Sequence, residues 1–352
     1  MINSLPISVC MIVKNEENFL ASALESVRAV LSPDEIIVAD TGSTDKTKEI
    51  ASENGAIVVD FPWCDDFSAA RNFSAVNASR DWILVLDADE EIISADTQDL
   101  LAFLRDERSV GAVTMIEIAS RTSSPLSRLY NRKHYVYSGI IHEQLVPVDN
   151  LRKKIIKEAP IHIVHHGYAP EIKESKGKLE RNEKLLLKEL AGNPNDPYLL
   201  YQLGKCYFDA SRDLQKASEA FEKALAAMPD YRLEYVYHLV ECYGYTLLKT
   251  DRYSDALEFI NGYYDRYGDK PQFRFLAAHV FQNNGMFIEA VEQYESCIDA
   301  NITDYSGITS YLAYYNIGVV LECVGMLEDA IEMYKNCGDY EPAVERLLCL
   351  TL

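Results

Sequence analysis

Short apolar runs alternate with helical patterns over the first third of the chain, and this alternation restricts the fold most strongly. The run ISVCMIV at 7–13 is apolar at successive positions and rich in β-branched residues, as in a strand buried on both faces. The segment NEENFLASALESVRAVL after it has apolar residues at helical spacing. Further strands are expected at 35–40, 56–61, 82–87 and 111–118, with helices at 67–79 and 94–107 between them. This order predicts an α/β domain with a mostly parallel sheet, covered by helices on both faces.

From about residue 175 the strand-like runs stop and small residues recur in pairs, 12 or 13 positions apart. A large residue follows each second member four positions later, and Pro229 closes the first unit. Small residues at this spacing let two antiparallel helices approach closely, as in tetratricopeptide repeats. We therefore expect an all-α repeat domain at 175–352, with an irregular helical bundle as the alternative. The pairs are Gly204–Ala217, Gly244–Ala256, Ala278–Ala290 and Gly318–Ala330.

The segment 121–174 lies between these two regions. It shows neither the alternating apolar runs of the first nor the paired small residues of the second, and it is interpreted as irregular. Five of the seven histidines fall in it, at 134, 142, 162, 165 and 166. Such a concentration between two regular regions suggests a site. We therefore expect a core at 1–120 and a segment at 121–174 that completes the site.

Composition argues against several classes of partner. Aspartate and glutamate number 55 against 34 lysines and arginines, a net charge of −21. This balance argues against an electrostatic grip on nucleic acid or an anionic membrane. The eight cysteines form no C-x-x-C, no stretch approaches a membrane span, and the N-terminus lacks a signal-peptide pattern. A cytoplasmic protein in a reducing compartment is expected.

The stretch ILVLDADEEI at 83–92 ends a buried strand on a group of acids. Asp87 and Asp89 lie at the carboxyl end of a strand in a parallel sheet, which is where such sheets bind ligands. One interpretation is an ordinary solvated turn. The other is an oxygen-ligand site for Mg²⁺ or Mn²⁺ that bridges a diphosphate.

Four motifs in order carry a family resemblance: ISVCMIVKNEE, EIIVADTGSTDKT, DFSAARN and WILVLDADEE. Together they resemble the family 2 glycosyltransferases, which have the GT-A fold of nucleotide-diphospho-sugar transferases. The repeats make the chain most similar to the tetratricopeptide-bearing branch, which includes the peptide S-glycosyltransferases. The resemblance is close over about 5–170 and looser over the repeats.

The resemblance implies roles on the donor side. Val13 to Glu16, with Asn15 between them, would line the uridine pocket, and Asp40 would accept a hydrogen bond from the uracil imide. The alternative for Asp40 is a helix cap, to which Ser43 is equally suited; Ser43 is also counted among the donor-binding residues.

In the same way Arg71 and Asn72 resemble a pair that faces the donor, with Arg71 suited to phosphate. Asp89 would bind the metal and Asp87 would touch the ribose or the metal, while Ala88 between them is counted among the donor-binding residues.

The stretch YSGIIHEQL resembles the family segment W-x-G-x-x-H-E, with Tyr137 where Trp is usual. It implies Glu143 as the catalytic base, with His142 as second candidate and an ordinary ion-paired glutamate as the alternative.

The stretch IVHHGY resembles a family H-x-G-Y stretch whose histidine completes the metal site. Alignment on Gly167 and Tyr168 selects His165, while His162 and His166 stay as alternatives.

The expected function is therefore an inverting, metal-dependent transfer from a UDP-hexose or UDP-N-acetylhexosamine to a Cys, Ser or Thr of a peptide or protein. The repeats would hold that acceptor or form a homodimer. Two alternatives stay open: a saccharide or lipid-linked acceptor in surface-glycan synthesis, and a tetratricopeptide scaffold with a degenerate transferase domain.

Overall fold

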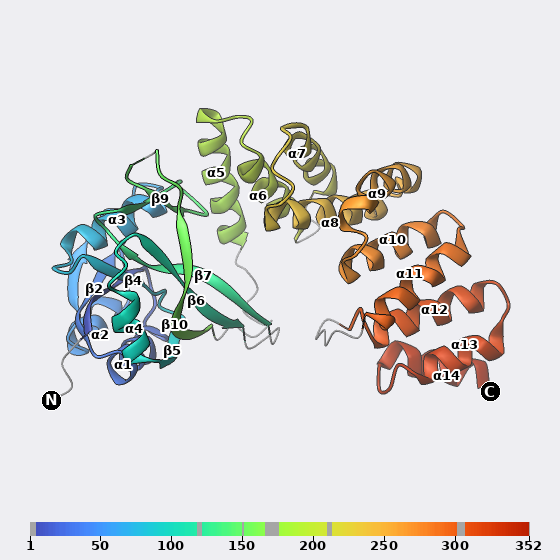
Figure 1. Ribbon diagram of the computed structural model, residues 1–352, viewed down its shortest axis with the longest axis horizontal. Coiled ribbons are helices and arrows are strands. Elements are labelled where there is room, and N and C mark those ends of the chain that lie inside the picture. Colours follow the sequence, from blue (N-terminus) through green and yellow to red (C-terminus); the bar gives the residue numbers. More distant parts are fainter. Residues whose placement is uncertain are drawn as a thin grey trace. The chain divides into compact units, whose positions relative to one another are not determined.

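The computed structural model describes residues 5–117, 122–149, 151–165, 176–209, 213–300 and 307–351. The chain divides into two compact units, Met1–Leu185 and Leu186–Leu352 (Figure 1). Within the described residues every strand belongs to the first unit, and the second is helical. The prediction of an α/β domain followed by helical repeats is confirmed.

An eight-stranded sheet forms the centre of the first unit, in the order β3-β2-β1-β4-β7-β6-β10-β5. Strand β1 (Leu5–Val13) lies between β2 (Pro33–Asp40) and β4 (Trp82–Val85), and β3 (Ile57–Asp60) follows β2; these neighbours all pair in parallel. The register sets Val13 opposite Asp40 and Asp40 opposite Asp60. The carboxyl ends of three strands are therefore level, which places the loops that follow them side by side.

The prediction that 121–174 is irregular is wrong for the described part of this segment. It contains β7 (Thr122–Asn131), β8 (Tyr135–Ser138), β9 (Gln144–Pro147) and β10 (Ile155–His165). Strand β7 is antiparallel to β4 and to β6 (Ser109–Glu117), and β10 is parallel to β6; β8 and β9 form a separate hairpin. The first four residues of β10 are exposed, so this strand lacks the continuous apolar run by which buried strands are recognised.

Strand β5 (Glu90–Ala95) was also missed, and the helix expected at 94–107 is the shorter α4 (Thr97–Phe103). Asp96 ends the strand and begins the helix, because its carboxylate accepts from the backbone N–H groups of Gln98 and Asp99. Strand β5 pairs antiparallel with β10, and this pairing sets His165 opposite Glu90.

Helices cover both faces of the sheet. On one face α1 (Leu20–Val30), α2 (Thr47–Glu53) and α4 bury apolar side chains against alternate residues of β1. On the other face α3 (Phe67–Asn77) and the β8–β9 hairpin pack over Cys10 and its neighbours. This hairpin therefore lies against α3, which also carries the AARN motif.

The second unit is built from antiparallel helix pairs, and its predicted small residues lie where helices meet. A Cβ on Gly204 would come within 2.3 Å of the Phe221 ring, and one on Gly318 within 2.6 Å of Tyr334. Only glycine fits at such a contact without a shift of the neighbouring ring. Helix α5 (Lys176–Gly192) crosses the boundary between the two units, and its first part, up to Leu185, belongs to the first unit. The further helices of the second unit are α6 (Pro197–Phe208), α7 (Leu214–Ala226), α8 (Glu234–Lys249), α9 (Tyr253–Tyr267), α10 (Pro271–Asn283), α11 (Phe287–Asp299), α12 (Tyr311–Cys323), α13 (Leu327–Lys335) and α14 (Glu341–Thr351). Of the described helices, none is long and apolar enough to span a bilayer.

Candidate active site

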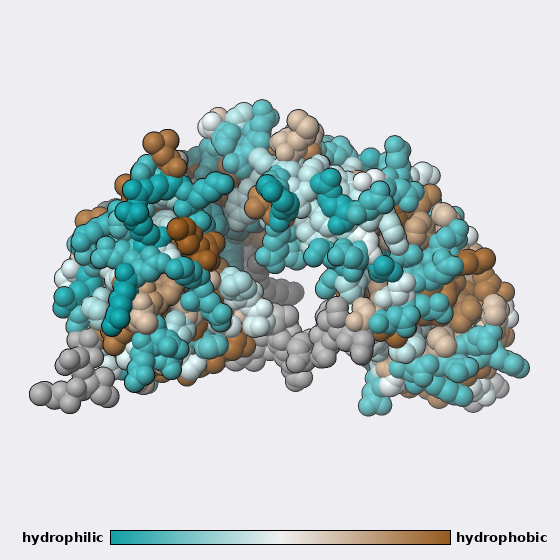
Figure 2. Space-filling view, in the orientation of Figure 1, coloured by the Kyte–Doolittle hydropathy of each residue, from teal (hydrophilic) through white to brown (hydrophobic). Residues whose placement is uncertain are grey.

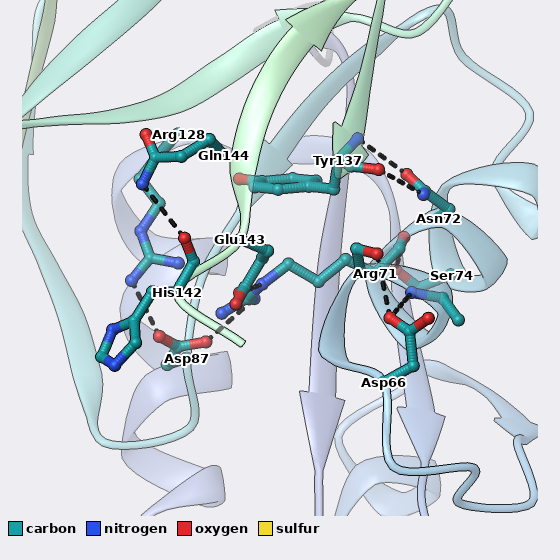
Figure 3. Close-up of polar contacts among 12 residues, drawn as sticks. Asp66, Arg71, Asn72, Ser74, Asp87, Arg128, Tyr137, His142, Glu143 and Gln144 are labelled. Atoms are coloured by element: carbon teal, nitrogen blue, oxygen red, sulfur yellow. Dashed lines mark hydrogen bonds and ion pairs between the residues drawn. The ribbon is translucent and has the colours of Figure 1, made fainter. Parts of the chain in front are cut away.

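A buried network of charges joins α3, the end of β4 and the β8–β9 hairpin. Arg71 is at its centre: Nε donates to Glu143 Oε1 at 2.5 Å, and Nη1 lies 3.1 Å from Asp87 Oδ1. Figure 3 shows the Arg71 guanidinium between the two carboxylates. Residues separated by 72 positions in the chain are therefore held together by one side chain.

Arg128 of β7 lies on the other side of Asp87 and was not predicted (Figure 3). Its Nη2 donates to Asp87 Oδ2 at 2.7 Å and to Glu90 Oε1 at 2.8 Å. Burial opposes the ionisation of Asp87, but Arg128 and Arg71 outweigh it and hold the pKa of Asp87 well below its usual range. Burial and the charge of Asp87 raise the pKa of Glu90 to about 7. Asp87 is thus a fixed anion with both oxygens bound by arginine.

Asp89 and His165 are brought together by the pairing of β5 with β10. His165 Nε2 lies 3.1 Å from Asp89 Oδ2, and both side chains are about one quarter exposed. His162 instead lies 3.1 Å from the hydroxyl of Ser94. His166, Gly167 and Tyr168 lie outside the described residues.

The residues around Asp89 fit a divalent cation. Within the described chain no three His, Cys, Asp or Glu side chains are gathered closely enough to hold a metal ion. Asp89 and His165 offer two ligands, and Mg²⁺ or Mn²⁺ in nucleotide sites commonly takes others from phosphates and water. Burial and the charges of Asp89, Asp45 and Asp87 raise the pKa of Glu16 to about 7, so this end of the sheet carries a negative potential that a cation would relieve.

Asp40, at the end of β2, has the geometry of a ligand acceptor. It is 3% exposed, and Oδ1 accepts from the backbone N–H groups of Gly42 and Ser43, both at 3.0 Å. Its Oδ2 is buried and has no hydrogen-bond partner among the described residues. Asp40 does not cap α2, which begins at Thr47 after Lys46. A buried carboxylate oxygen without a donor is costly, and a ligand N–H at this position would satisfy it.

The loops after β1 and β2 are joined by hydrogen bonds. The backbone N–H of Asn15 donates to Ser43 Oγ at 2.9 Å, and the Asn15 amide oxygen accepts from the Thr44 N–H at 2.8 Å. The Glu16 N–H donates to Thr47 Oγ1 at 2.7 Å. Asn15 adopts φ 57°, in the left-handed region that Asn tolerates better than most residues. These bonds hold Val13 and Glu16 next to Asp40.

A cavity of about 230 Å³ opens beside these loops. Val13, Glu16 and Thr41 are among the residues that line it, as are Trp63, Phe67 and Arg181. The Trp63 and Phe67 rings meet edge to face with centroids 4.8 Å apart, and the Arg181 guanidinium lies 5.3 Å from the Phe67 centroid. Aromatic faces with a nearby cation suit a planar base that carries phosphates.

The acceptor-side candidates occupy the turn of the β8–β9 hairpin. Glu143 is mostly buried and ion-paired with Arg71, as the alternative of an ordinary ion-paired glutamate also requires. His142 precedes it with φ 51°, a strained conformation for this residue. Asn72 donates to the Tyr137 carbonyl at 2.9 Å and accepts from the Tyr137 N–H at 3.0 Å, so its amide fixes β8 (Figure 3). Ala88, 5% exposed, contributes a small buried side chain between the two acids.

Comparison with known proteins identifies two parts of the chain. Residues 8–172 match the model of the family "Glycosyl transferase family 2". Residues 8–172 are a family 2 glycosyltransferase domain. Residues 197–231 match the model of the tetratricopeptide repeat. The family predicted from the four motifs is therefore confirmed, as is the presence of the repeat.

Among curated relatives of the chain, a TPR repeat-containing protein of Synechococcus elongatus is 35% identical over 276 residues, 72% of this chain and 66% of that protein. An uncharacterized glycosyltransferase of Rickettsia typhi is 34% identical over 149 residues, 39% of this chain and 50% of that protein. The glycosyltransferase SunS of Bacillus phage SPbeta is 28% identical over 211 residues, 55% of this chain and 47% of that protein. The chain thus aligns with about half to two thirds of the length of these relatives.

Sequence reasoning missed five side chains that the glycosyltransferase domain and the start of α5 bring to the site. Trp63 and Phe67 flank the acids just before the AARN motif, and this aromatic pair was a usable signal. Arg128 lies in a strand that the periodicity did not reveal, and Arg181 lies beyond the family match. Glu90 belongs to the DADEE stretch, yet its role depends on Arg128.

Proposed function

We propose that the protein is an inverting, divalent-metal-dependent glycosyltransferase. Its donor is a UDP-hexose or UDP-N-acetylhexosamine, and its acceptor is a Cys, Ser or Thr side chain of a peptide or protein. The observation that carries the donor assignment is Asp40, whose buried Oδ2 accepts from no donor in the part of the chain that the structure describes. The imide N–H of uracil supplies such a donor, whereas the cytosine ring nitrogen at the same position carries no proton.

The remaining donor-side groups follow from their positions. Trp63 and Phe67 offer faces for the base, and Arg181 offers a cation. Asp89 and His165 would hold Mn²⁺ or Mg²⁺. When bound, the ion would neutralise charge that develops on the departing diphosphate.

On the acceptor side we assign Glu143 as the base and Arg71 as the group that orients it, with His142 as second candidate. The acceptor oxygen or sulfur attacks the anomeric carbon, its proton passes to the carboxylate, and the bond from that carbon to the diphosphate breaks. Asp87 cannot serve as this base, because both its oxygens accept from arginines that hold its pKa low.

The repeats support a peptide or protein acceptor, since stacked helix pairs commonly present surfaces that bind extended peptides. A chain of net charge −21 favours an acceptor segment rich in Lys or Arg. We also propose that the repeats form the interface of a homodimer.

The decisive experiment is calorimetric titration of UDP-hexoses and UDP-N-acetylhexosamines, with and without Mn²⁺. We expect one or two sugars to bind at micromolar concentration only with metal, and binding to be lost in Asp89→Ala. Asp60→Ala is the matched control, because Asp60 ends strand β3 at the same edge of the parallel strands, with its side chain exposed and paired to Lys48. Mass spectrometry of basic peptides containing Cys, Ser or Thr then identifies the acceptor.

Failure to bind any uridine nucleotide, with or without metal, would refute the donor assignment and favour the scaffold alternative. Donor binding with sugar transfer only to saccharide or lipid-linked acceptors would retain the chemistry and refute the peptide acceptor.

A further inference from the structure

A cationic surface lies at the end of the β8–β9 hairpin that is remote from Glu143. It surrounds a cavity of about 510 Å³, and the cationic side chains Arg108, Lys133, Arg152 and Lys153 line it. In a chain of net charge −21 such a cluster is unexpected from composition. Net charge does not show where individual charges lie, and the fold gathers these four cations around one cavity.

Exposed apolar side chains lie close to these cations along the chain: Val148 and Ile155 line the same cavity, Leu151 precedes Arg152, and Ile156 follows Ile155. Val148, Leu151, Ile155 and Ile156 are 57%, 96%, 49% and 51% exposed. Figure 2 shows hydrophobic side chains projecting from a hydrophilic surface in the region where Figure 1 draws β9. We call these four apolar residues, together with the four cations, the hairpin-end surface.

Two of the four cations have no ion-pair partner among the residues that the structure describes. Lys133 pairs with Asp81 at 2.6 Å and Arg152 with Asp149 at 3.0 Å. Arg108 and Lys153 form no ion pair with any described residue. Acids elsewhere on the protein that lie beyond the Debye length of about 8 Å in physiological salt are largely screened from a ligand at this surface. A positive potential therefore persists locally.

We propose that the hairpin-end surface docks the protein on an anionic phospholipid membrane, with Leu151 in the interface and lipid phosphates against Lys153 and Arg108. Lysine and arginine near exposed leucine and isoleucine suit the boundary between headgroups and acyl chains, where the cations reach phosphate and the apolar groups leave water. A soluble anion would use the cations but would leave Leu151 in water. This inference is independent of the proposed transfer reaction.

The hairpin relates this surface to the site. Tyr135 pairs with Pro147 at one end of the hairpin, and Ser138 pairs with Gln144 at the other, next to Glu143. Four residues of strand span about 13 Å. Docking would therefore hold the acceptor side of the glycosyltransferase domain within roughly this distance of the headgroups.

Sedimentation of the full chain with vesicles tests the proposal. We expect binding to vesicles that contain phosphatidylglycerol, weak binding to pure phosphatidylcholine, and release at high salt. Lys153→Ala should lower the partition coefficient about fivefold, and Leu151→Ser about tenfold. Both side chains are exposed, so thermal unfolding should be unchanged. Lys223→Ala and Ile288→Ser, at exposed sites in the repeats, are the matched controls.

Three results would each overturn the proposal. The first is equal sedimentation with both kinds of vesicle, and the second is binding that neither Lys153→Ala nor Leu151→Ser weakens. The third is calorimetric binding of inorganic phosphate that Lys153→Ala abolishes while no vesicle binds, which would assign the surface to a soluble anion.

Discussion

Replacement of Arg128 by methionine is the sharpest test of the buried charge network. The change keeps much of the side-chain volume and removes the cation that binds both Asp87 and Glu90. Asp87 retains Arg71 at 3.1 Å. Glu90 retains only the backbone N–H of Asp87 among its described donors. The variant therefore leaves a buried carboxylate without its cation.

The size of the effect depends on pH through Glu90. The pKa of Glu90 in the folded wild type is about 7 against 4.5 for the ordinary group, so ionised Glu90 already costs about 3 kcal/mol in the folded state above pH 7. Because the folded state binds a proton that the unfolded state releases, the contribution of Glu90 to the free energy of unfolding of the wild type falls as pH rises from 4.5 to about 7. Without Arg128 the pKa of Glu90 in the folded state rises further, so the free energy of unfolding continues to fall above pH 7. We expect Arg128→Met to cost about 4 kcal/mol at pH 8 and about half of that at pH 6.

Urea unfolding followed by tryptophan fluorescence measures this loss in the glycosyltransferase domain, because Trp63 and Trp82 are the only tryptophans and both lie in the first unit. Arg152→Met is the control: its exposed ion pair should contribute less than about 1 kcal/mol at either pH. Adding Glu90→Gln to Arg128→Met should restore part of the stability at pH 8. An equal loss at pH 6 and pH 8, with no restoration by Glu90→Gln, would refute the reasoning.

Three further predictions follow from single positions. Asp40→Asn should weaken UDP binding about tenfold or more, since its amide places a donor where the uracil imide needs an acceptor; calorimetry with unchanged affinity would contradict this assignment. Arg181→Ala should raise the KM for the donor about fivefold with little change in kcat, because the guanidinium lines the cavity away from Glu143; steady-state kinetics showing only a lower kcat would place it in the chemistry instead. Gly204→Ala should cost about 1–3 kcal/mol in urea unfolding because its Cβ meets Phe221, whereas Gly262→Ala meets no atom within 4 Å and should be neutral or stabilising; equal effects would show that the helix contact adapts.

The sequence alone determined the alternation of the first four strands and their helices. Strands β1, β2 and β4 are largely buried on both faces, so their apolar runs are continuous and easy to recognise, and the edge strand β3 keeps an apolar run although it is partly exposed. It also placed Asp40, Asp87 and Asp89 at strand ends, because a carboxyl end is marked by the change from apolar to polar residues. The small residues of the repeats were predictable for a related reason: close helix contacts recur with the repeat.

Only the tertiary structure decided which of these groups act together. Strands β5, β7 and β10 carry exposed residues and bends, so local pattern did not reveal them, yet their pairing brings His165 to Asp89 and Arg128 to Asp87. Arg181 reaches the cavity from a helix beyond the matched domain. The net charge likewise gave no sign of the hairpin-end surface, because it is summed over all residues and does not show where the charged side chains lie. Sequence periodicity indicates which face of its own helix or strand a residue occupies. Contacts between elements that are distant in the chain exist only after the sheet has formed.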